Sequence, residues 1–343
     1  MKFLNKKGIF FTFITILLLL VILAAFIAKT SQSYSSNYQK EESKILTINS
    51  FVKSFDSVAS KVLEASAKQA IYSSQKYMSD QATENSRNRN RNRNPYITQG
   101  GNYENSFSQL IIDGRQGTIE LDGMQDTQGQ RNGLNIRTTL YQLQQSVKAN
   151  NGIILEYQEP NPGDISIIQI SPWELEVTLT LRNVKIYYPK DSQDTNPRFQ
   201  ESNIRWDLSG SERIIKTKLY VTDFLDPLRL AEEAQIVKIK KTLITRFTKK
   251  SDLDSFISNN EFLAHQHGPN FLQRMSGDFS DDSLGYGIES VLDPTTHTTQ
   301  KSAVDYIYFS TNDPVKCQAQ GYSNLYLDNA HAQFYTGLPC PAP

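Results

Sequence analysis

The N-terminal sequence contains an apolar run that is long enough to cross a membrane. The segment Ile9 to Ala28 holds roughly twenty residues without a charge, enough for a helix to span a bilayer core of about 30 Å. Basic residues flank it unevenly: Lys2, Lys6 and Lys7 before the run, and Lys29 after it. Since cytoplasmic flanks carry the excess of Lys and Arg, we expect a cytoplasmic basic leader over 1–8, a transmembrane helix over 9–28 and an extracellular remainder. The alternative is a secretion signal cleaved near Ala28.

A second helical pattern follows the apolar run and predicts an extracellular helical stalk over 29–80. Neither Gly nor Pro occurs between Ile9 and Asp80, so nothing obliges the helix to break. A continuous rod would be roughly 110 Å long at 1.5 Å per residue. Its weak point is the Ser- and Asn-containing stretch KTSQSYSSNYQK, which could form a hinge. Apolar residues at spacings of three and four form one stripe along this helix. We call this stripe the seam, and it consists of Ile48, Val52, Phe55, Ala59 and Val62. The seam predicts either packing against the chain's own head or a helix–helix assembly surface.

Residues 81–106 contain a low-complexity linker in which four arginines alternate with asparagine. Such a segment has too little apolar surface to build a core, so the sequence predicts a flexible loop. Arginine repeats can contact phosphates, but aromatic residues are not interleaved with them. The chain as a whole is balanced, with 36 basic and 36 acidic residues, so nucleic acid is not an expected partner.

From residue 107 the pattern becomes that of a mixed domain with an antiparallel sheet and packed helices. SQLIIDG and GTIELDG read as two short strands around a glycine turn, and a helix is expected from Ile136 to the Asn-Asn-Gly signal that ends at Gly152. Further strands are predicted in GIILEYQ, DISIIQIS, WELEVTLTLRNVKIYY, IRWDLSG and ERIIKTKLYVTDF. Apolar and polar residues alternate from Leu175 to Arg182, which is typical of a half-exposed antiparallel sheet. The expected fold class is therefore α+β, with this head over 107–226.

A helix over 227–260 and a turn-rich region over 261–343 complete the predicted organisation. Asp226 can cap the helix, and Pro227 suits its first turn. The two cysteines, Cys317 and Cys340, both lie in the final region. Outside the cytosol such a pair is oxidised, so a structural disulfide is expected, contributing about 3 kcal/mol on the chain-entropy model.

The sequence favours a non-enzymatic head. It lacks a Gly-x-Ser-x-Gly elbow, a phosphate-binding Walker loop and a His-Glu-x-x-His motif, so no cofactor is expected. His265 and His267 are the weak metal candidates, because residues two apart in a strand share a face, but no third ligand stands at a fixed spacing. The acidic stretch SGDFSDDS lacks the spacing of an EF-hand loop. His265, Ser276 and Asp293 form a catalytic triad only on paper.

The start of the chain resembles archaeal type IV pilin-like proteins with a class III signal peptide. The resemblance rests on KKG directly before IFFTFITILLLLVILAAF, and it implies that a dedicated prepilin peptidase cuts after Gly8 and leaves Ile9 as the new N-terminus. Many of these proteins carry a glutamine or a small polar residue directly after the cut, where this chain has Ile9. Bacterial pilins carry a glutamate five residues in, where this chain has Phe13. FLDPL, HGPNFLQRMSG and YGIES resemble phrases in uncharacterised archaeal surface proteins with this N-terminus.

The sequence supports two function hypotheses from different classes. The favoured one is a membrane-anchored cell-surface protein, pilin-like, that serves in adhesion or as a minor pilus subunit. Its partners would be the membrane, the prepilin peptidase and other pilin-like subunits. The alternative is a membrane-tethered extracellular hydrolase or sensor domain.

Overall fold

The computed structural model describes residues 6–85, 103–116, 119–120, 133–188, 205–207, 212–233, 235–277, 285–297, 300–310 and 315–341. It is an α+β structure with antiparallel sheets and several helices, as the sequence predicts. The chain divides into two compact units. Unit 1 comprises residues 1–55, 146–156 and 185–207, and unit 2 comprises 56–145, 157–184 and 208–343. Most of the predicted Arg/Asn-rich linker lies outside the described residues.

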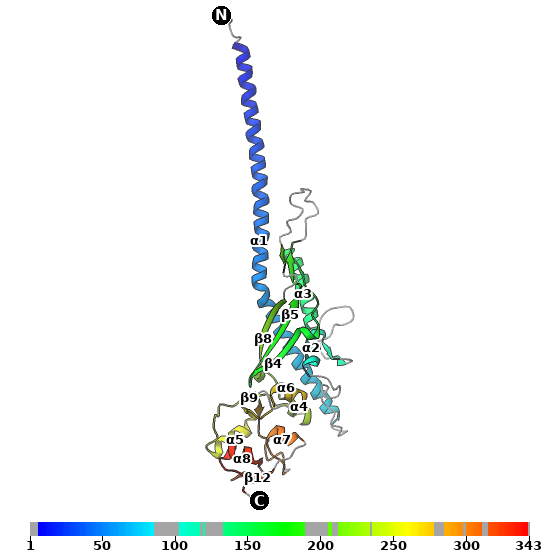
Figure 1. Ribbon diagram of the computed structural model, residues 1–343, viewed down its shortest axis with the longest axis vertical. Helices are drawn as coiled ribbons and strands as arrows, with labels where there is room; N and C mark the ends of the chain where they lie inside the picture. Colours follow the sequence, from blue (N-terminus) through cyan, green and yellow to red (C-terminus); the bar gives the residue numbers. More distant parts are fainter. Residues whose placement is uncertain are drawn as a thin grey trace. The chain divides into compact units, whose positions relative to one another are not determined.

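The first element, α1 (Lys6–Asn85), is one unbroken helix of 80 residues that contributes to both units. Figure 1 shows it as a single coiled ribbon, and the stretch KTSQSYSSNYQK does not interrupt it. The predicted membrane span at 9–28 is helical, but its side chains lie outside the described residues. Within the part of the chain that the structure describes in full, no helix combines the length and apolar character that a membrane span requires.

Unit 1 contains a small antiparallel sheet in the order β3-β6-β7. Its strands are β3 (Ile154–Glu156), β6 (Lys185–Tyr187) and β7 (Arg205–Asp207). The second half of α3 (Ile136–Asn151) belongs to this unit, and the helix ends as predicted, with Gly152 in the left-handed conformation at φ 66°. The core of the unit is apolar, with buried Ile48, Phe51, Phe55, Val147, Leu155 and Ile186.

Unit 2 contains the larger antiparallel sheet, in the order β4-β5-β8. The strands β4 (Ile165–Ser171), β5 (Glu174–Arg182) and β8 (Glu212–Tyr220) lie side by side in Figure 1. The predicted alternation is confirmed, because Leu175, Val177, Leu179 and Leu181 are fully buried while the residues between them are partly exposed. The opposite face carries cross-strand ion pairs, such as Glu176 to Lys216 at 2.7 Å.

Two helices supply the apolar partners of this sheet. Ser108 of α2 (Tyr103–Asp113) donates a hydrogen bond to the Ile165 carbonyl of β4 at 3.1 Å. The part of α1 that belongs to unit 2 is tied to β8, where Ser60 donates to the Lys216 carbonyl at 2.8 Å and Arg213 pairs with Asp56. A stripe at spacings of three and four is fully buried on this part of α1: Ala59, Leu63, Ala67, Ala70, Ile71 and Met78.

The rest of unit 2 is built from short elements. They are η1 (Pro162–Asp164), η3 (Val221–Asp223), α4 (Pro227–Glu233), β9 (Lys240–Lys241), α5 (Lys250–Ser258), β10 (Glu261–Ala264), α6 (Phe271–Ser276), β11 (Ile288–Glu289), α7 (Asp305–Phe309), β12 (Lys316–Gln318), β13 (Tyr326–Asp328) and α8 (Asn329–Thr336). Separately, β1 (Arg115–Gln116) pairs antiparallel with β2 (Ile119–Glu120). Phe256, Val304, Leu325 and Leu327 are among the core residues of the C-terminal region.

Two predicted elements are wrong. SQLIIDG is not a strand but the end of α2, in which Phe107, Leu110 and Ile111 are buried on one helical face. The predicted helix over 227–260 is also incorrect, because α4 ends at Glu233 and α5 begins only at Lys250. Between them the chain turns back and pairs with the segment before α4, with Ile239 N–H donating to the Phe224 carbonyl at 3.0 Å. This intervening stretch is rich in β-branched residues, which favour extended structure.

Candidate functional site

The candidate site lies in unit 2 and begins with His265, directly after β10. The His265 amide donates to the Gly287 carbonyl at 2.9 Å, and the His265 carbonyl accepts from the Gly268 amide at 3.1 Å. The two glycine segments approach so closely that a Cβ on Gly287 would lie 1.9 Å from the Gly268 carbonyl oxygen. The turn AHQHGPN is therefore held against β11 by its backbone, which fixes the place of the imidazole.

Glu289 of β11 supplies the acidic group of the site. Its side chain is completely buried, and its Oε1 accepts a hydrogen bond from the Tyr335 hydroxyl at 2.7 Å. Its Oε2 faces two imidazoles, with His265 Nδ1 at 3.2 Å and His331 Nε2 at 3.1 Å. Burial, followed by the nearby Glu289 charge, raises the pKa of Tyr335 well above its usual value, so the hydroxyl remains a donor.

His331 stands in the first turn of α8 and is oriented by the residue that caps this helix. The Asp328 carboxylate accepts from the His331 backbone amide at 3.2 Å and contacts its Nδ1 at 2.7 Å and 2.8 Å. This contact places the hydrogen on Nδ1 and turns Nε2 toward Glu289. Burial alone would lower the pKa of His331, but hydrogen bonds to Asp328 and Glu289 outweigh it and raise the pKa to about 10.

The three groups form a compact cluster. One atom each from His265, Glu289 and His331 lie within 4.8 Å of one another. The pKa of His265 is lowered, chiefly by burial and against the opposing charge of Glu289, so its imidazole is neutral near pH 7. Its Nδ1 is buried but makes no hydrogen bond, although it faces Glu289. Two nitrogens and one carboxylate oxygen are a ligand set suited to zinc.

A buried charge network stands next to the cluster. The Arg274 guanidinium of α6 donates to Asp226 at 2.8 Å and 2.9 Å and to Asp305 at 2.6 Å. Asp305 also accepts from the Ser290 hydroxyl at 2.7 Å, and Arg229 donates to the same hydroxyl at 2.8 Å. The three sequence phrases FLDPL, HGPNFLQRMSG and YGIES therefore meet in one place, because they contain Asp226, Arg274 and Ser290 respectively.

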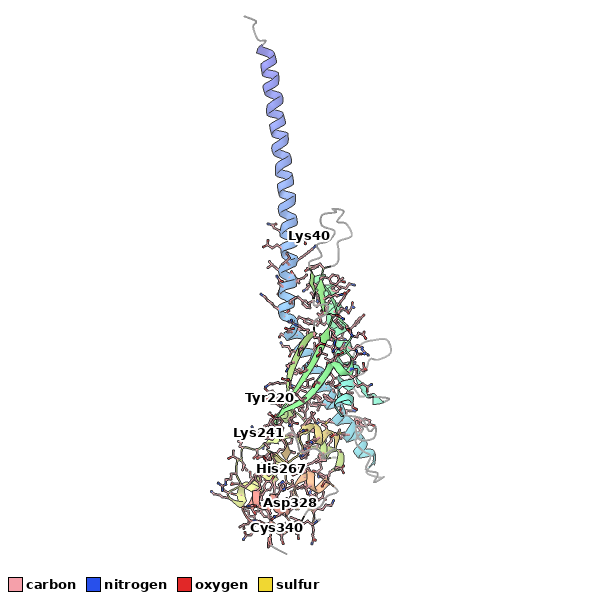
Figure 2. All side chains as sticks on the ribbon, in the orientation of Figure 1. Lys40, Tyr220, Lys241, His267, Asp328 and Cys340 are labelled. Atoms are coloured by element: carbon pink, nitrogen blue, oxygen red, sulfur yellow. A yellow bond between two sulfur atoms is a disulfide. The ribbon has the colours of Figure 1, made fainter. Side chains whose placement is uncertain are left out.

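The predicted pair His265 and His267 is only half present in the cluster. Figure 2 labels His267, whose side chain is exposed and whose Nε2 contacts the Gln266 side chain at 2.9 Å. Sequence reasoning missed His331, which lies 66 positions after His265 along the chain. The signal that could have found it is Asp328-x-x-His331, a capping aspartate three residues before a histidine. The combination of His265, Ser276 and Asp293 does not form a catalytic triad. The Ser276 hydroxyl donates a hydrogen bond to the Gln273 carbonyl, and Asp293 accepts one from the Thr295 hydroxyl.

Some of the remaining predicted site residues lie in the part of the chain that the structure describes, and others lie outside it. The disulfide is present, joining Cys317 of β12 to Cys340 with their Cα atoms 5.4 Å apart. Gly8 and Ile9 lie in α1, but their surroundings are outside the described side chains, and SGDFSDDS is largely outside the described residues. In the seam, Ile48, Phe55 and Ala59 are buried, and Val52 and Val62 are half-buried.

Comparison with family models, with curated proteins and with solved structures finds no match to this chain.

Proposed function

We propose that this chain is a non-enzymatic, membrane-anchored cell-surface protein of pilin-like type. The observation that carries the proposal is α1, one helix of 80 residues that contains the apolar segment Ile9 to Ala28 and buries one face of its later turns in unit 2. The first part of such a helix can lie in a membrane, while its later part is held by the β4-β5-β8 sheet.

The disulfide and the lysines before the apolar segment support an extracellular head. Cys317 and Cys340 are paired, which is expected for a domain exposed to an oxidising compartment. The lysines before Ile9 direct the N-terminus to the cytoplasm and the head to the outside. In this proposal the head serves in adhesion or as a minor pilus subunit. A tethered hydrolase or sensor domain is the alternative, and it would need substrate to reach the cluster in which Glu289 and His331 are buried.

The experiment that tests the proposal is the intact mass of the protein isolated from the membranes of the cells that make it. Cleavage after Gly8 gives a chain that starts at Ile9, cleavage near Ala28 gives a released head, and an uncut chain retains Met1. We expect the first mass. A chain starting near residue 29 would refute anchoring, and an uncut chain would refute pilin-type processing.

A matched pair of variants sharpens this test. Gly8→Trp places a bulky ring at the predicted cut, and we expect it to leave the uncut precursor in the membrane. Leu4→Trp places the same ring in the leader, away from the cut, and is expected to be processed normally. Equal processing of the two variants would contradict cleavage after Gly8.

A further inference from the structure

We propose that His265, Glu289 and His331 bind one zinc ion in the C-terminal region of unit 2. The inference goes beyond the proposed function and does not depend on membrane anchoring. The ligand atoms are Nδ1 of His265, Oε2 of Glu289 and Nε2 of His331, which come from the turn after β10, from β11 and from α8.

The distances from Glu289 to the two imidazoles match those of a zinc site, and the two imidazole nitrogens lie within 4.8 Å of each other. In a tetrahedral site with bonds of about 2.0–2.1 Å, two ligand atoms lie about 3.3 Å apart. The two imidazole nitrogens stand 3.2 Å and 3.1 Å from Oε2 of Glu289. Three protein ligands leave the fourth position to a water molecule, and the partly exposed side of His265 gives solvent access to it.

The surrounding groups are those that orient metal ligands. Asp328 holds Nδ1 of His331 at 2.7 Å, which is the arrangement of a carboxylate behind a metal-binding histidine. The Tyr335 hydroxyl occupies the other oxygen of Glu289 at 2.7 Å and leaves Oε2 for the ion. Each buried ligand is therefore fixed by a second hydrogen-bonding partner.

The charges of the site also suit a bound cation. Glu289 and Asp328 are both buried carboxylates. Among the side chains that the structure describes, the basic groups paired with them are histidines, whereas Arg274 is committed to Asp226 and Asp305. Nδ1 of His265 is also buried with no hydrogen bond. A divalent ion accounts for all three groups together.

The test uses the full-length protein in detergent, stripped with a chelator, dialysed and then titrated with zinc chloride alone. We expect saturation at one zinc per chain by equilibrium dialysis, and cobalt(II) bound in the same place should give the visible absorption of a tetrahedral complex. Because zinc would bind the folded chain, the midpoint of thermal unfolding should rise with zinc and fall again with chelator. A wild-type chain that binds no zinc saturably would overturn the proposal.

The variants are graded by the role of each residue. His265→Ala removes a ligand whose Nδ1 has no hydrogen bond, so the fold should survive, and we expect a loss of affinity greater than the roughly 10–100-fold that a missing supporting partner costs. Glu289→Gln should show a similar loss. Asp328→Asn preserves the helix cap and should cost about 10–100-fold. His331→Ala is less informative, because it leaves two buried carboxylates without their partner.

Two histidines outside the cluster provide matched controls. His297 contacts Glu233 at 2.6 Å elsewhere in unit 2, and His267 is the exposed neighbour of the site. His297→Ala and His267→Ala are both expected to bind one zinc with unchanged affinity. Retained binding in His265→Ala, or an equal loss in either control, would overturn this ligand set.

Discussion

The Arg274 guanidinium is completely buried and lies between two carboxylates that come from separate helical segments. Asp226 precedes α4 and Asp305 begins α7, so one side chain joins α4, α6 and α7. Burial would lower the pKa of Arg274, but the two carboxylates outweigh it and raise the pKa, so the side chain stays charged. Removing one member of such a network leaves buried charge without a partner.

Arg274→Ala should therefore lower the free energy of unfolding by about 3–5 kcal/mol. The measurement is urea unfolding of the full-length protein in detergent, followed by tryptophan fluorescence. Arg213→Ala is the matched control, because Arg213 pairs with Asp56 at the surface and its loss should cost less than about 1 kcal/mol. Similar midpoints for the two variants would show that the buried network does not stabilise unit 2.

The disulfide gives a second prediction about individual residues. Cys317 and Cys340 are separated by 23 positions, and opening a loop of this size costs about 3 kcal/mol on the chain-entropy model. The double variant Cys317→Ser and Cys340→Ser should lose about that much stability in the same unfolding experiment. Alkylation of unreduced protein in fresh membranes should label neither cysteine, and labelling of both would contradict the pairing there.

The helix α1 carries both buried and exposed apolar residues, and substitutions at the two kinds should affect stability differently. Phe55 belongs to the apolar core of unit 1 and is 1% exposed, whereas Leu46 is 62% exposed. Phe55→Asp should destabilise the protein by about 4 kcal/mol or more, because it removes a buried ring and buries a charge. Leu46→Asp should change stability by less than about 0.5 kcal/mol. Limited proteolysis of the full-length protein distinguishes the two outcomes, and a resistant Phe55→Asp protein would argue against self-packing of the seam.

The same variants separate folding from assembly under the proposed function. Because Phe55 is buried within the chain, a charge there would impair folding and could not isolate a contact with another subunit. Leu46→Asp leaves the head intact, so we expect it to weaken crosslinking to pilin-like partners in cells. Crosslinking equal to that of the unaltered chain would remove the exposed face of α1 near Leu46 from the assembly surface.

At the scale of the whole molecule, the question is whether the segment Ile9 to Ala28 serves only as a membrane anchor or also as an assembly helix. Anchoring requires only hydrophobicity and length, so replacing Ile9 to Ala28 with an unrelated apolar segment should keep the protein in the membrane fraction. Subunit assembly requires particular side chains, so the same exchange should abolish crosslinking to pilin-like partners. Retention of both properties would reduce the segment to a simple tether, and loss of membrane association would contradict the anchor.

The sequence predicted the elements whose periodicity is long and consistent. The helix from Ile136 ends at its Asn-Asn-Gly signal, and the alternation from Leu175 to Arg182 became a strand with one buried face. Short apolar runs were less informative. SQLIIDG has too few residues to distinguish a strand from a buried helix, and the residues after Glu233 form extended structure by pairing with a segment that precedes α4.

Local sequence patterns were sufficient to predict α1 and the alternating strands, because each depends on neighbouring residues. They were also sufficient for the disulfide, because each of the two cysteines has one possible partner. The cluster of His265, Glu289 and His331 depends on three segments that are distant in the chain, and the buried network around Arg274 does so as well. The spacing of these residues along the chain does not predict that they lie close together in the fold. They come together because the close contact of Gly268 with Gly287 aligns His265 with β11, and because the Asp328 cap turns His331 toward Glu289.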